Sequence, residues 1–440
     1  MKSKYGIIIF LLFAVPALSS FAQDKWDLSM CIEQALKNNS DIKRQAVQVE
    51  KQTIQIQSDR YKRLPNLIAG GTQKLDFGRS LNRENTYNDV NSQTSVFSIG
   101  TEMPIFTGFN ISNTIAQHKL ELNAFKENLA KTENDIKLQV AIYYYQVLLN
   151  KEIHAIAAEQ ITLSKELEGM TQVLVNHGKA PGSQLLEAQA QVSNDELHAV
   201  QAYNTLRLSI VDLIQLMELK HSDNFDIDSL PADSVFQLLD QPDHIYEVAC
   251  RIMPEIKSAS YIVDSREKAL KVSQSGYYPT VSLQAEINSG YYHYSNIDNT
   301  SFNSQLKNNL QKTVYLTVRI PLFNRFETRS AVRMAKKDLD DSRLIVENAQ
   351  KTLYKEIQKA YYDAVSANEK YLTTQKAIAS NREALRYVQE KYNAGKSTAY
   401  EFNEAKVKLA NSLSEQSQAK YEFILQKYLL DFYSGIQKII

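Results

Sequence analysis

The sequence contains few of the residues that interrupt regular secondary structure. Of its 440 residues, 13 are glycine and 9 are proline, about 5% together, whereas the two usually make up about 12% of a globular protein. So few breakers in so long a chain exclude a fold built from many short strands and turns. Long, uninterrupted elements are expected instead.

Three further absences exclude other classes of protein. The 50 basic and 50 acidic side chains cancel, so no positive excess is available to bind nucleic acid. Two cysteines cannot build a disulfide scaffold, and neither has a zinc-type spacing. The mean hydropathy is −0.37, which excludes a membrane protein made of several apolar helices of about 20 residues.

The first 22 residues have the pattern of a secretory signal peptide. Lys2 and Lys4 precede one apolar run, residues 6–18, and the small-x-small ending Ser20-Phe21-Ala22 is typical of a cleavage site. We therefore expect the mature protein to begin at Gln23 and to work outside the cytoplasm.

The rest of the chain contains the same plan twice. Asn176-His177-Gly178-Lys179 recurs 217 residues later as Asn393-Ala394-Gly395-Lys396, and Pro104-Ile105-Phe106 recurs at the same offset as Pro321-Leu322-Phe323. Coincidences at one offset indicate a duplication. We divide the mature chain into a first repeat, a connector and a second repeat, at residues 23–217, 218–243 and 244–440.

Each repeat is predicted to contain a helix, a β-hairpin, a very long helix and a return helix. Between Pro65 and Pro104, and between Pro279 and Pro321, the hydrophobic period changes from 3.6 to 2. Polar loops at 79–91 and 294–309 divide these segments. We predict strands at about 66–78, 92–106, 279–293 and 310–323.

The helices that follow the strands are expected to be rods. About 70 residues without proline follow Phe106 and Phe323, and at about 1.5 Å per residue each spans about 100 Å. Gly178 and Gly395 end them, where a left-handed residue is expected. The first helix is expected from Leu28 to about Tyr61, and the return helices at about 183–217 and 398–433. The rods fit either a solvated coiled coil or a wall of helices.

The strands have the alternation of an outer-membrane barrel, apolar on one face and polar on the other. Four strands of about ten residues cannot close a barrel, and open strand edges are not viable in lipid. Three chains would supply twelve strands. A soluble sandwich sheet has the same alternation, but it gives no reason for rods of this length.

Together these features resemble the TolC-type outer-membrane efflux protein family over essentially all of the mature sequence. The duplicated helix–hairpin–helix–helix plan, the Pro-[Ile/Leu]-Phe after the second strand of each repeat and the turn glycines carry the resemblance. It implies an α+β membrane protein. A homotrimer would form a 12-stranded β-barrel in the outer-membrane lipid of a Gram-negative bacterium, continued by a long periplasmic α-helical barrel.

The resemblance also implies a function and partners. The protein would be the passive exit duct of a tripartite efflux pump or type I secretion system, with no catalytic residues, metal or cofactor. It would dock a periplasmic adaptor protein and an inner-membrane transporter of the RND or ABC type.

Two alternatives belong to other classes. A periplasmic coiled-coil adaptor also has long helical hairpins, but it carries one hairpin and glycine-rich β domains. An enzyme is disfavoured because the seven histidines are scattered, with no metalloprotease, nucleophile-elbow or phosphate-loop motif. His177 is interpreted as a helix C-terminal residue, and the run 143–145 of three tyrosines as helix packing. Cys31 and Cys250 are interpreted as buried hydrophobes rather than a disulfide, and Cys31 as unlipidated.

The resemblance assigns roles to two groups of residues. The turns between the paired helices resemble the part of the family that contacts the adaptor; these residues are Gly178, Lys179, Gly395 and Lys396. The prolines that bound the strands mark the barrel-to-helix junctions, at Pro65, Pro104, Pro279 and Pro321.

Glu401 and Glu404 are candidates for a pore constriction. They lie three residues apart on one face of the second return helix. In the protein that gives the family its name, two aspartates at the same distances after the turn glycine line the narrowest periplasmic constriction. A trimer would present six carboxylates there, and like-charge crowding would raise some of their pKa values. Glu401 also completes a capping box with Thr398, so a purely structural role is an alternative for it.

Tyr392 matches a tyrosine of the closing network in that protein. The ion pair beside it is missing, because Ser397 stands in place of an arginine and Gln184 in place of an aspartate. We therefore expect the constriction to be held closed more weakly, or by different contacts.

Overall fold

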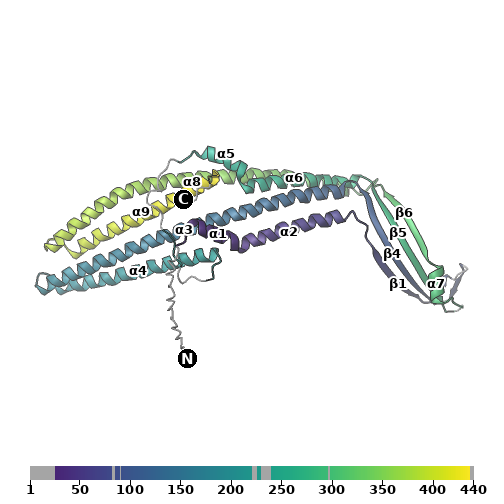
Figure 1. Ribbon diagram of the computed structural model, residues 1–440, viewed down its shortest axis with the longest axis horizontal. Coiled ribbons are helices and arrows are strands. Elements are labelled where there is room, and N and C mark those ends of the chain that lie inside the picture. The colour runs from purple at the N-terminus through teal and green to yellow at the C-terminus, as the bar shows by residue number, and fades with distance from the viewer. Residues whose placement is uncertain are drawn as a thin grey trace, which may run out of the picture.

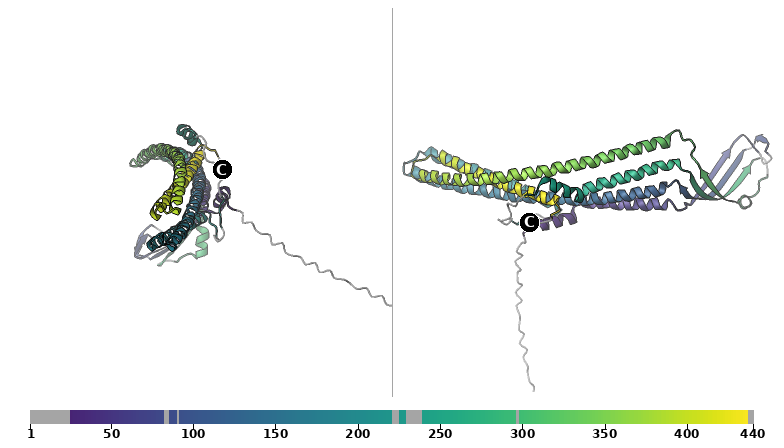
Figure 2. Two further views of the ribbon diagram at one scale, coloured as in Figure 1. Left: turned by 90° about the vertical axis from the view of Figure 1, so that its left-hand side faces the viewer. Right: turned by 90° about the horizontal axis from the view of Figure 1, so that it is seen from above.

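The computed structural model describes residues 25–81, 85–89, 91–220, 225–228, 239–295 and 298–436. The predicted signal peptide lies outside these residues. The molecule is elongated, with a β-sheet at one end and long helices that run away from it (Figure 1). Seen along its length, the helices form a curved wall that is open on one side (Figure 2).

Both halves of the chain have the same order of elements. The first half contains α1 (Leu28–Asn38), α2 (Ser40–Tyr61), β1 (Ile68–Asp76), β2 (Arg79–Leu81), β3 (Tyr87–Asp89), β4 (Ser92–Thr107), α3 (Asn110–Asn176) and α4 (Gly182–Leu216). The second half contains α5 (Pro242–Ile252), α6 (Pro254–Gln274), the 3-10 turn η1 (Ser275–Tyr277), β5 (Thr280–Tyr294), α7 (Phe302–Asn308), β6 (Gln311–Arg319), α8 (Glu327–Asn393) and α9 (Ala399–Tyr433).

The long helices have equal lengths in the two halves. Helices α3 and α8 each contain 67 residues, and helices α4 and α9 each contain 35. The rods expected from the sequence are therefore present, and each spans about 100 Å. Their turns lie at the end of the molecule far from the sheet (Figure 1).

The turns have the conformation that the glycines predicted. Gly178 has φ of 71° and Gly395 has φ of 70°. In the first turn the N–H of Lys179 donates to the carbonyl of Leu174 at 2.9 Å, and in the second the N–H of Lys396 donates to the carbonyl of Lys391 at 2.8 Å. These bonds define a Schellman motif, which ends a helix by satisfying carbonyls of its last turn. His177 is the C-cap residue, as expected.

The prediction of one continuous helix from Leu28 to Tyr61 is wrong, because Asn39 separates two helices. The Asn39 side chain accepts hydrogen bonds from the N–H groups of Asp41, at 2.9 Å, and Ile42, at 3.3 Å, so it caps α2 and ends α1. In the second half, α5 ends before Pro254, which takes the first position of α6. Proline suits that position because it has no N–H to leave unpaired.

The polar loops expected at 79–91 and 294–309 contain regular structure. Strands β2 and β3 pair in the first loop, and α7 lies in the second. The Gln305 side chain of α7 bonds to both the N–H and the carbonyl of Tyr292, each at 2.9 Å. Helix α7 therefore continues the hydrogen bonding of β5 beyond the end of β6.

The four main strands form one antiparallel sheet in the order β1-β4-β5-β6. The central strands β4 and β5 contain 16 and 15 residues, whereas β1 and β6 contain nine each. Strand β1 therefore covers only one half of β4, and β6 covers the opposite half of β5. Within the described residues, the outer edges of β1 and β6 have no strand partner.

The largest apolar core lies midway along the helices. Tyr144 and Tyr145 of α3 are buried there, which confirms helix packing for the tyrosine run. Cys31 is fully buried in the same core, Cys250 is half-buried, and both are free thiols. Trp26 forms a parallel bridge with Ile227 of the connector, which fastens the start of the described chain to this core. No described helix is both long and apolar enough to cross a bilayer.

Candidate functional site

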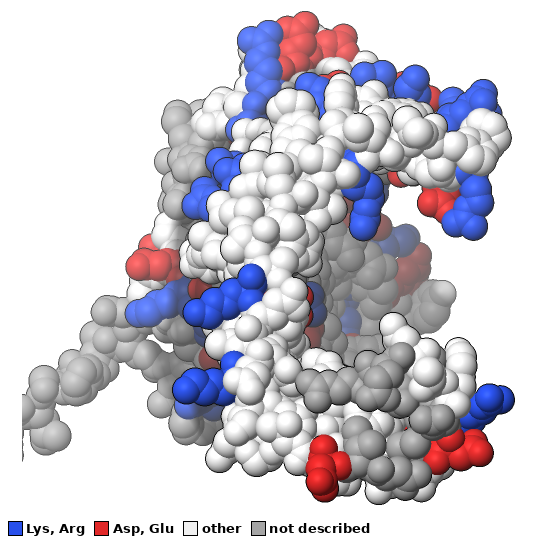
Figure 3. All heavy atoms as spheres, turned by 90° about the vertical axis from the view of Figure 1, so that its right-hand side faces the viewer, with Lys and Arg blue, Asp and Glu red and all other residues white. Residues whose placement is uncertain are grey.

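One face of the sheet is apolar and exposed. Strand partners on this face form two rows, Met103–Leu283–Leu316 and Ile99–Ile287. These five side chains keep 37–60% of their surface exposed. Burying them is favourable, at about 25 cal/mol per Å² of apolar surface. Figure 3, which looks at the molecule from the sheet end, shows a mostly uncharged surface there.

The opposite face of the same strands is polar. Its rows join Glu102 to Gln284 and Tyr315, and Glu286 to Thr313. A sheet with one apolar and one polar face fits a boundary between lipid and water. The alternation predicted from the sequence is therefore confirmed.

The junctions between strands and helices share a feature that was not predicted from the sequence. Phe109 and Phe326 precede the long helices with φ of 65° and 63°, which is uncommon for a residue other than glycine. Each packs edge-to-face on the phenylalanine three residues earlier, at ring distances of 5.2 and 5.5 Å. The signal was in the sequence, because both copies of Pro-[Ile/Leu]-Phe extend to Phe-x-x-Phe.

The four prolines assigned to these junctions occupy different places. Pro65 lies between α2 and β1, and Pro279 lies directly before β5. Pro104 lies inside β4, where a β-bulge shifts the register with β5. Pro321 follows the end of β6. Proline has no N–H to donate to a neighbouring strand, so inside a strand it is tolerated where a bulge already interrupts the pairing.

The turns at the far end of the helices are open to solvent. Gly178, Lys179, Gly395 and Lys396 are all exposed. A Cβ built on either glycine meets no other atom within 4 Å, so only their positive φ favours glycine.

The carboxylates of Glu401 and Glu404 are exposed near the second turn. The Thr398 hydroxyl accepts from the N–H of Glu401 at 3.2 Å, and the Glu401 carboxylate accepts from the N–H of Thr398 at 3.3 Å, which forms the capping box. The Ser397 hydroxyl also donates to Glu401. These bonds lower the pKa of Glu401, chiefly through Ser397. Glu404 instead pairs with Lys408 at 2.7 Å.

Tyr392 lies inside the wall, whereas these carboxylates are exposed. It is buried, and its hydroxyl shares a hydrogen bond of 2.7 Å with the hydroxyl of Thr171. This bond joins α8 to α3, and therefore joins the two helical hairpins, α3–α4 and α8–α9.

A buried polar cluster joins the same two hairpins closer to their middle. Lys406 of α9 is 1% exposed and forms an ion pair with Asp195 of α4. The Lys406 ammonium also donates to the hydroxyl of Ser164 on α3 at 2.5 Å, and Ser164 donates to Asp195. The Gln191 side chain donates to the second carboxylate oxygen of Asp195 at 2.9 Å. The charge of Lys406 is thus neutralised, and both oxygens of the Asp195 carboxylate accept hydrogen bonds, as a buried ion pair requires.

This cluster was not predicted from the sequence, although a signal was present. Lys406 lies between Phe402 and Leu409 at the spacing of the buried face of α9, and Asp195 lies between Val192 and Ala199 on the buried face of α4. Opposite charges at two core positions indicate a buried pair.

A third polar link joins the hairpins near the middle of the molecule. Lys420 and Tyr421 of α9 donate to the same carboxylate oxygen of Glu152 on α3, at 2.8 and 2.7 Å. Burial alone would raise the pKa of Glu152, but these bonds outweigh it and lower the pKa.

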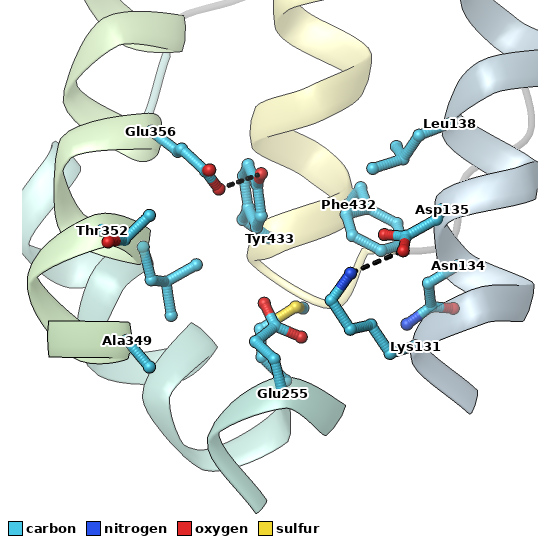
Figure 4. Close-up of a pocket in the computed structure, with 12 residues that line it drawn as sticks. Lys131, Asn134, Asp135, Leu138, Glu255, Ala349, Thr352, Glu356, Phe432 and Tyr433 are labelled. Carbon is cyan, nitrogen blue, oxygen red and sulfur yellow. Dashed lines mark hydrogen bonds and ion pairs between the residues drawn. The ribbon is translucent and has the colours of Figure 1, made fainter. Parts of the chain in front are cut away.

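A cavity of about 320 Å³ lies where α9 ends and α6 begins. Its side chains converge from α3, α6, α8 and α9 (Figure 4). Lys131 pairs with Asp135 at 2.5 Å, and Tyr433 donates to Glu356 at 3.3 Å. Burial raises the pKa of Glu255 beside them. No group of three metal-ligating side chains occurs here or elsewhere in the described residues.

Comparison with known proteins assigns the fold to a class of outer-membrane channels. A solved structure of CusC, a transmembrane channel, superimposes with a TM-score of 0.79 at 15% identity, covering 93% of this chain and 92% of that one. The family model for outer membrane efflux proteins matches residues 31–217 and 246–433. The chain belongs to this family.

Curated relatives span most of the chain. The outer membrane efflux protein BepC of Brucella suis is 21% identical over 405 residues, 92% of this chain and 84% of that protein. The alkaline protease secretion protein AprF of Pseudomonas aeruginosa is 21% identical over 384 residues, 85% of this chain and 77% of that protein. The protein is therefore a non-enzymatic channel protein of the Gram-negative outer membrane that extends into the periplasm.

Proposed function

We propose that three copies of this chain form the passive exit duct of a tripartite efflux pump or type I secretion system. The proposal rests on one observation. Within the described residues, the sheet that continues the curved wall of helices has two open edges, at β1 and β6. Strand β6 runs in the direction that pairs antiparallel with β1 of a second copy, because neighbours in the sheet alternate in direction. Three copies supply a closed sheet of twelve strands.

The stagger of the strands supports closure with three copies. The outer end of β1, Asp76, is level with Tyr294 of β5, whereas the outer end of β6, Gln311, is level with Asn288. Full pairing of β6 with β1 of the next copy therefore shifts each copy by about six residues, or about eighteen around three copies. Twelve strands with this shear tilt by about 45°, within the range of membrane barrels.

The faces of the sheet support one register for this pairing. Val314, Leu316 and Val318 are on the apolar face of β6, and Ala69 and Gly71 share that face through β1. If Gln311 lies opposite Asp76 of the next copy, Val314 lies opposite Gln73 and both faces continue across the joint. If the pairing were shifted by one residue, the apolar face of one copy would be continuous with the polar face of the next.

The open edges of the helical wall also carry apolar side chains. On α4 they recur along one side of the helix, at Leu186, Leu197, Val200, Leu208 and Val211. On α8 the exposed apolar residues include Leu344, Ile345, Tyr362 and Val365. Helix α8 bounds one side of the wall, and α4 bounds the other side in the half that contains the turns (Figure 1), so these side chains would pack against the neighbouring copies. Exposed apolar surface of this extent is typical of an interface.

In the assembled duct, the turns at Gly178 and Gly395 point away from the outer membrane. There they would contact a periplasmic adaptor protein, which connects the duct to an inner-membrane transporter. Glu401 and Glu404 lie within two turns of the start of α9, close to the same end. Three copies would bring six carboxylates around one axis and favour the passage of cations.

The proposal is tested with the full-length protein purified in mild detergent. We expect a trimeric mass and stepwise conductance in planar bilayers. A monomer at every concentration, or recovery with the soluble periplasm, would contradict the trimeric barrel. Export of a reporter substrate from cells that lack the gene, restored by the wild-type chain, tests the duct separately from its assembly.

A further inference from the structure

Basic side chains are concentrated where α8 leaves the sheet. Residues 325–337 contain five basic side chains and one acidic side chain, although the whole chain is neutral. We call the exposed group Arg325, Arg329, Arg333 and Lys336 the basic collar. Arg329, Arg333 and Lys336 follow one another at intervals of four and three residues, so they share one side of the helix. The buried side of α8 there carries Thr328, Ala335 and Leu339 instead.

Little within the chain neutralises this charge. Arg325 pairs with Glu327 at 3.1 Å, and the guanidinium of Arg329 lies 5.7 Å from the centre of the Phe326 ring. Among the described residues, Arg333 and Lys336 have no ion-pair partner within 4.0 Å. The collar is therefore available to an external anion.

The duplicated fold does not require the three arginines of the collar. At the offset of 217 residues, the positions of Arg325, Arg329 and Arg333 correspond to Gly108, Ser112 and Ala116 of the first repeat. Helix α3 packs between α2 and α6, whereas α8 lies at an open edge of the wall. Lys336 corresponds to Lys119 of α3, but only the helix at the open edge carries the three arginines, which points to a partner outside the chain.

The collar continues directly from an exposed apolar segment. Leu322, Phe323 and Phe326 are 93%, 73% and 58% exposed. They lie between the end of β6 and the collar, so apolar strand, aromatic side chains and basic side chains follow one another along the chain. This order is typical of the boundary between the hydrocarbon of a bilayer and its headgroups.

The opposite edge of the wall adds charge of the same sign. Arg60 and Arg63 are exposed at the end of α2, where that helix approaches the sheet. The described residues give Arg60 no acidic partner, and the guanidinium of Arg63 donates to the Ser112 hydroxyl, at 3.0 Å. In the proposed trimer, α8 of one copy approaches α2 of the next. Like charges then meet at the level of the headgroups and repel one another unless an anion lies between them.

We propose that the basic collar binds the phosphate headgroups of anionic phospholipids in the periplasmic leaflet of the outer membrane. This proposal rests on the proposed function, because it requires the sheet to lie in the bilayer. Basic side chains beside a membrane-embedded segment attract anionic lipid with about 1 kcal/mol each. The exposed aromatic residues contact the adjoining acyl chains.

The test compares two double variants of the full-length protein. Arg329→Gln with Arg333→Gln removes two collar charges. Lys355→Gln with Lys359→Gln is the matched control, because it removes two exposed charges at the same spacing on α8, about 39 Å farther from the sheet. Each protein is reconstituted in vesicles of phosphatidylcholine alone and in vesicles that also contain phosphatidylglycerol, and bound lipid is counted by native mass spectrometry.

We expect the wild-type protein and the control to prefer phosphatidylglycerol, and the collar variant to lose about fivefold in that preference for each arginine removed. An equal preference in all three proteins, or none in the wild type, overturns the collar while insertion and trimeric mass leave the duct proposal standing. Failure of the wild-type protein to insert as a trimer overturns the proposed function, and the collar with it.

Discussion

Lys406 and Asp195 form an ion pair inside the helical wall, across the boundary between the two hairpins. Both side chains are at least nine-tenths buried. Thr171 with Tyr392 lies nearer the turns, and Glu152 with Lys420 lies nearer the middle of the molecule. The two hairpins are therefore held together by polar contacts at three levels along their length.

Replacing Lys406 by methionine should strongly destabilise the protein. The change leaves the Asp195 carboxylate buried without a counter-charge, which costs about 3–5 kcal/mol. Thermal and denaturant unfolding of the purified protein measure this loss of stability. The double variant Lys406→Met with Asp195→Leu should recover most of the loss. Lys408→Met, which removes an exposed lysine from the same helix, is the control and should have little effect. Equal effects of Lys406→Met and Lys408→Met would contradict a buried pair.

Cysteines at Val314 and Gln73 should join neighbouring copies by a disulfide. The proposed register places these residues opposite each other on β6 and β1 of adjacent copies, within reach of a disulfide. Oxidation should give a covalent trimer on a denaturing gel. Val314→Cys with Thr72→Cys is the control, because Thr72 is on the other face of β1. Efficient cross-linking of the control pair instead would show that the register is displaced by one residue.

Acid should abolish the stabilising effect of Glu152. Its folded pKa is lowered, so its contribution is present above the ordinary value of 4.5 and is lost as the pH falls through the folded value. Glu152→Gln should therefore lower the melting temperature at about pH 7, and this effect should shrink steadily as the pH falls below 4.5. Melting curves across this range measure the difference between the two proteins. A difference that does not change with pH would mean that packing, rather than charge, explains the effect.

Glu404→Gln should reduce the preference of the channel for cations. Glu401→Gln should have a smaller effect, because the Glu401 carboxylate is engaged in the capping box, and glutamine preserves that box. Reversal potentials in planar bilayers measure the selectivity, and trivalent metal ions test for block. Glu415→Gln, an exposed change farther along α9, is the control. Unchanged selectivity and block in the double variant at 401 and 404 would exclude these residues from the constriction.

Valine at Gly178 or Gly395 should strain the turn, because φ near 70° is unfavourable for a β-branched residue. The expected cost is about 1–3 kcal/mol. Asparagine, which tolerates this conformation, is the matched control and should largely preserve stability. Lys179→Glu and Lys396→Glu then test docking by charge alone. Loss of export with unchanged trimer yield and melting temperature supports docking, whereas parallel loss of export and stability indicates a structural role.

The sequence predicted the elements that depend on local pattern. The rods, the alternating strands and the left-handed glycines follow from helix breakers, period and turn chemistry. The break at Asn39 was missed, because one asparagine inside a helical pattern is compatible with either a cap or an exposed helical position. Helix α7 was missed because its seven residues are stabilised by bonds from Gln305 and Asn309 to β5, which a local pattern does not reveal.

The candidate sites were less predictable, because they depend on contacts between distant segments. Position in the chain indicated that Tyr392 lies near a turn, but its partner Thr171 is 221 residues away. The cluster around Lys406 contains side chains from three helices, so its contacts could not be predicted without knowing how those helices pack. The arrangement of Glu401 and Glu404 around a common axis depends on other copies of the chain.

The equal lengths of the paired helices have a consequence for symmetry. Because α3 and α8 match in length, as do α4 and α9, a three-copy assembly presents six turns at about the same height, in two alternating kinds. One kind contains His177 and Pro181, and the other contains Ala394 and Thr398. A ring of three partner subunits could select one kind of turn. A ring of six identical subunits would have to bind both kinds of turn. The two kinds have nearly the same backbone conformation but different side chains, so the six contacts would not be equivalent.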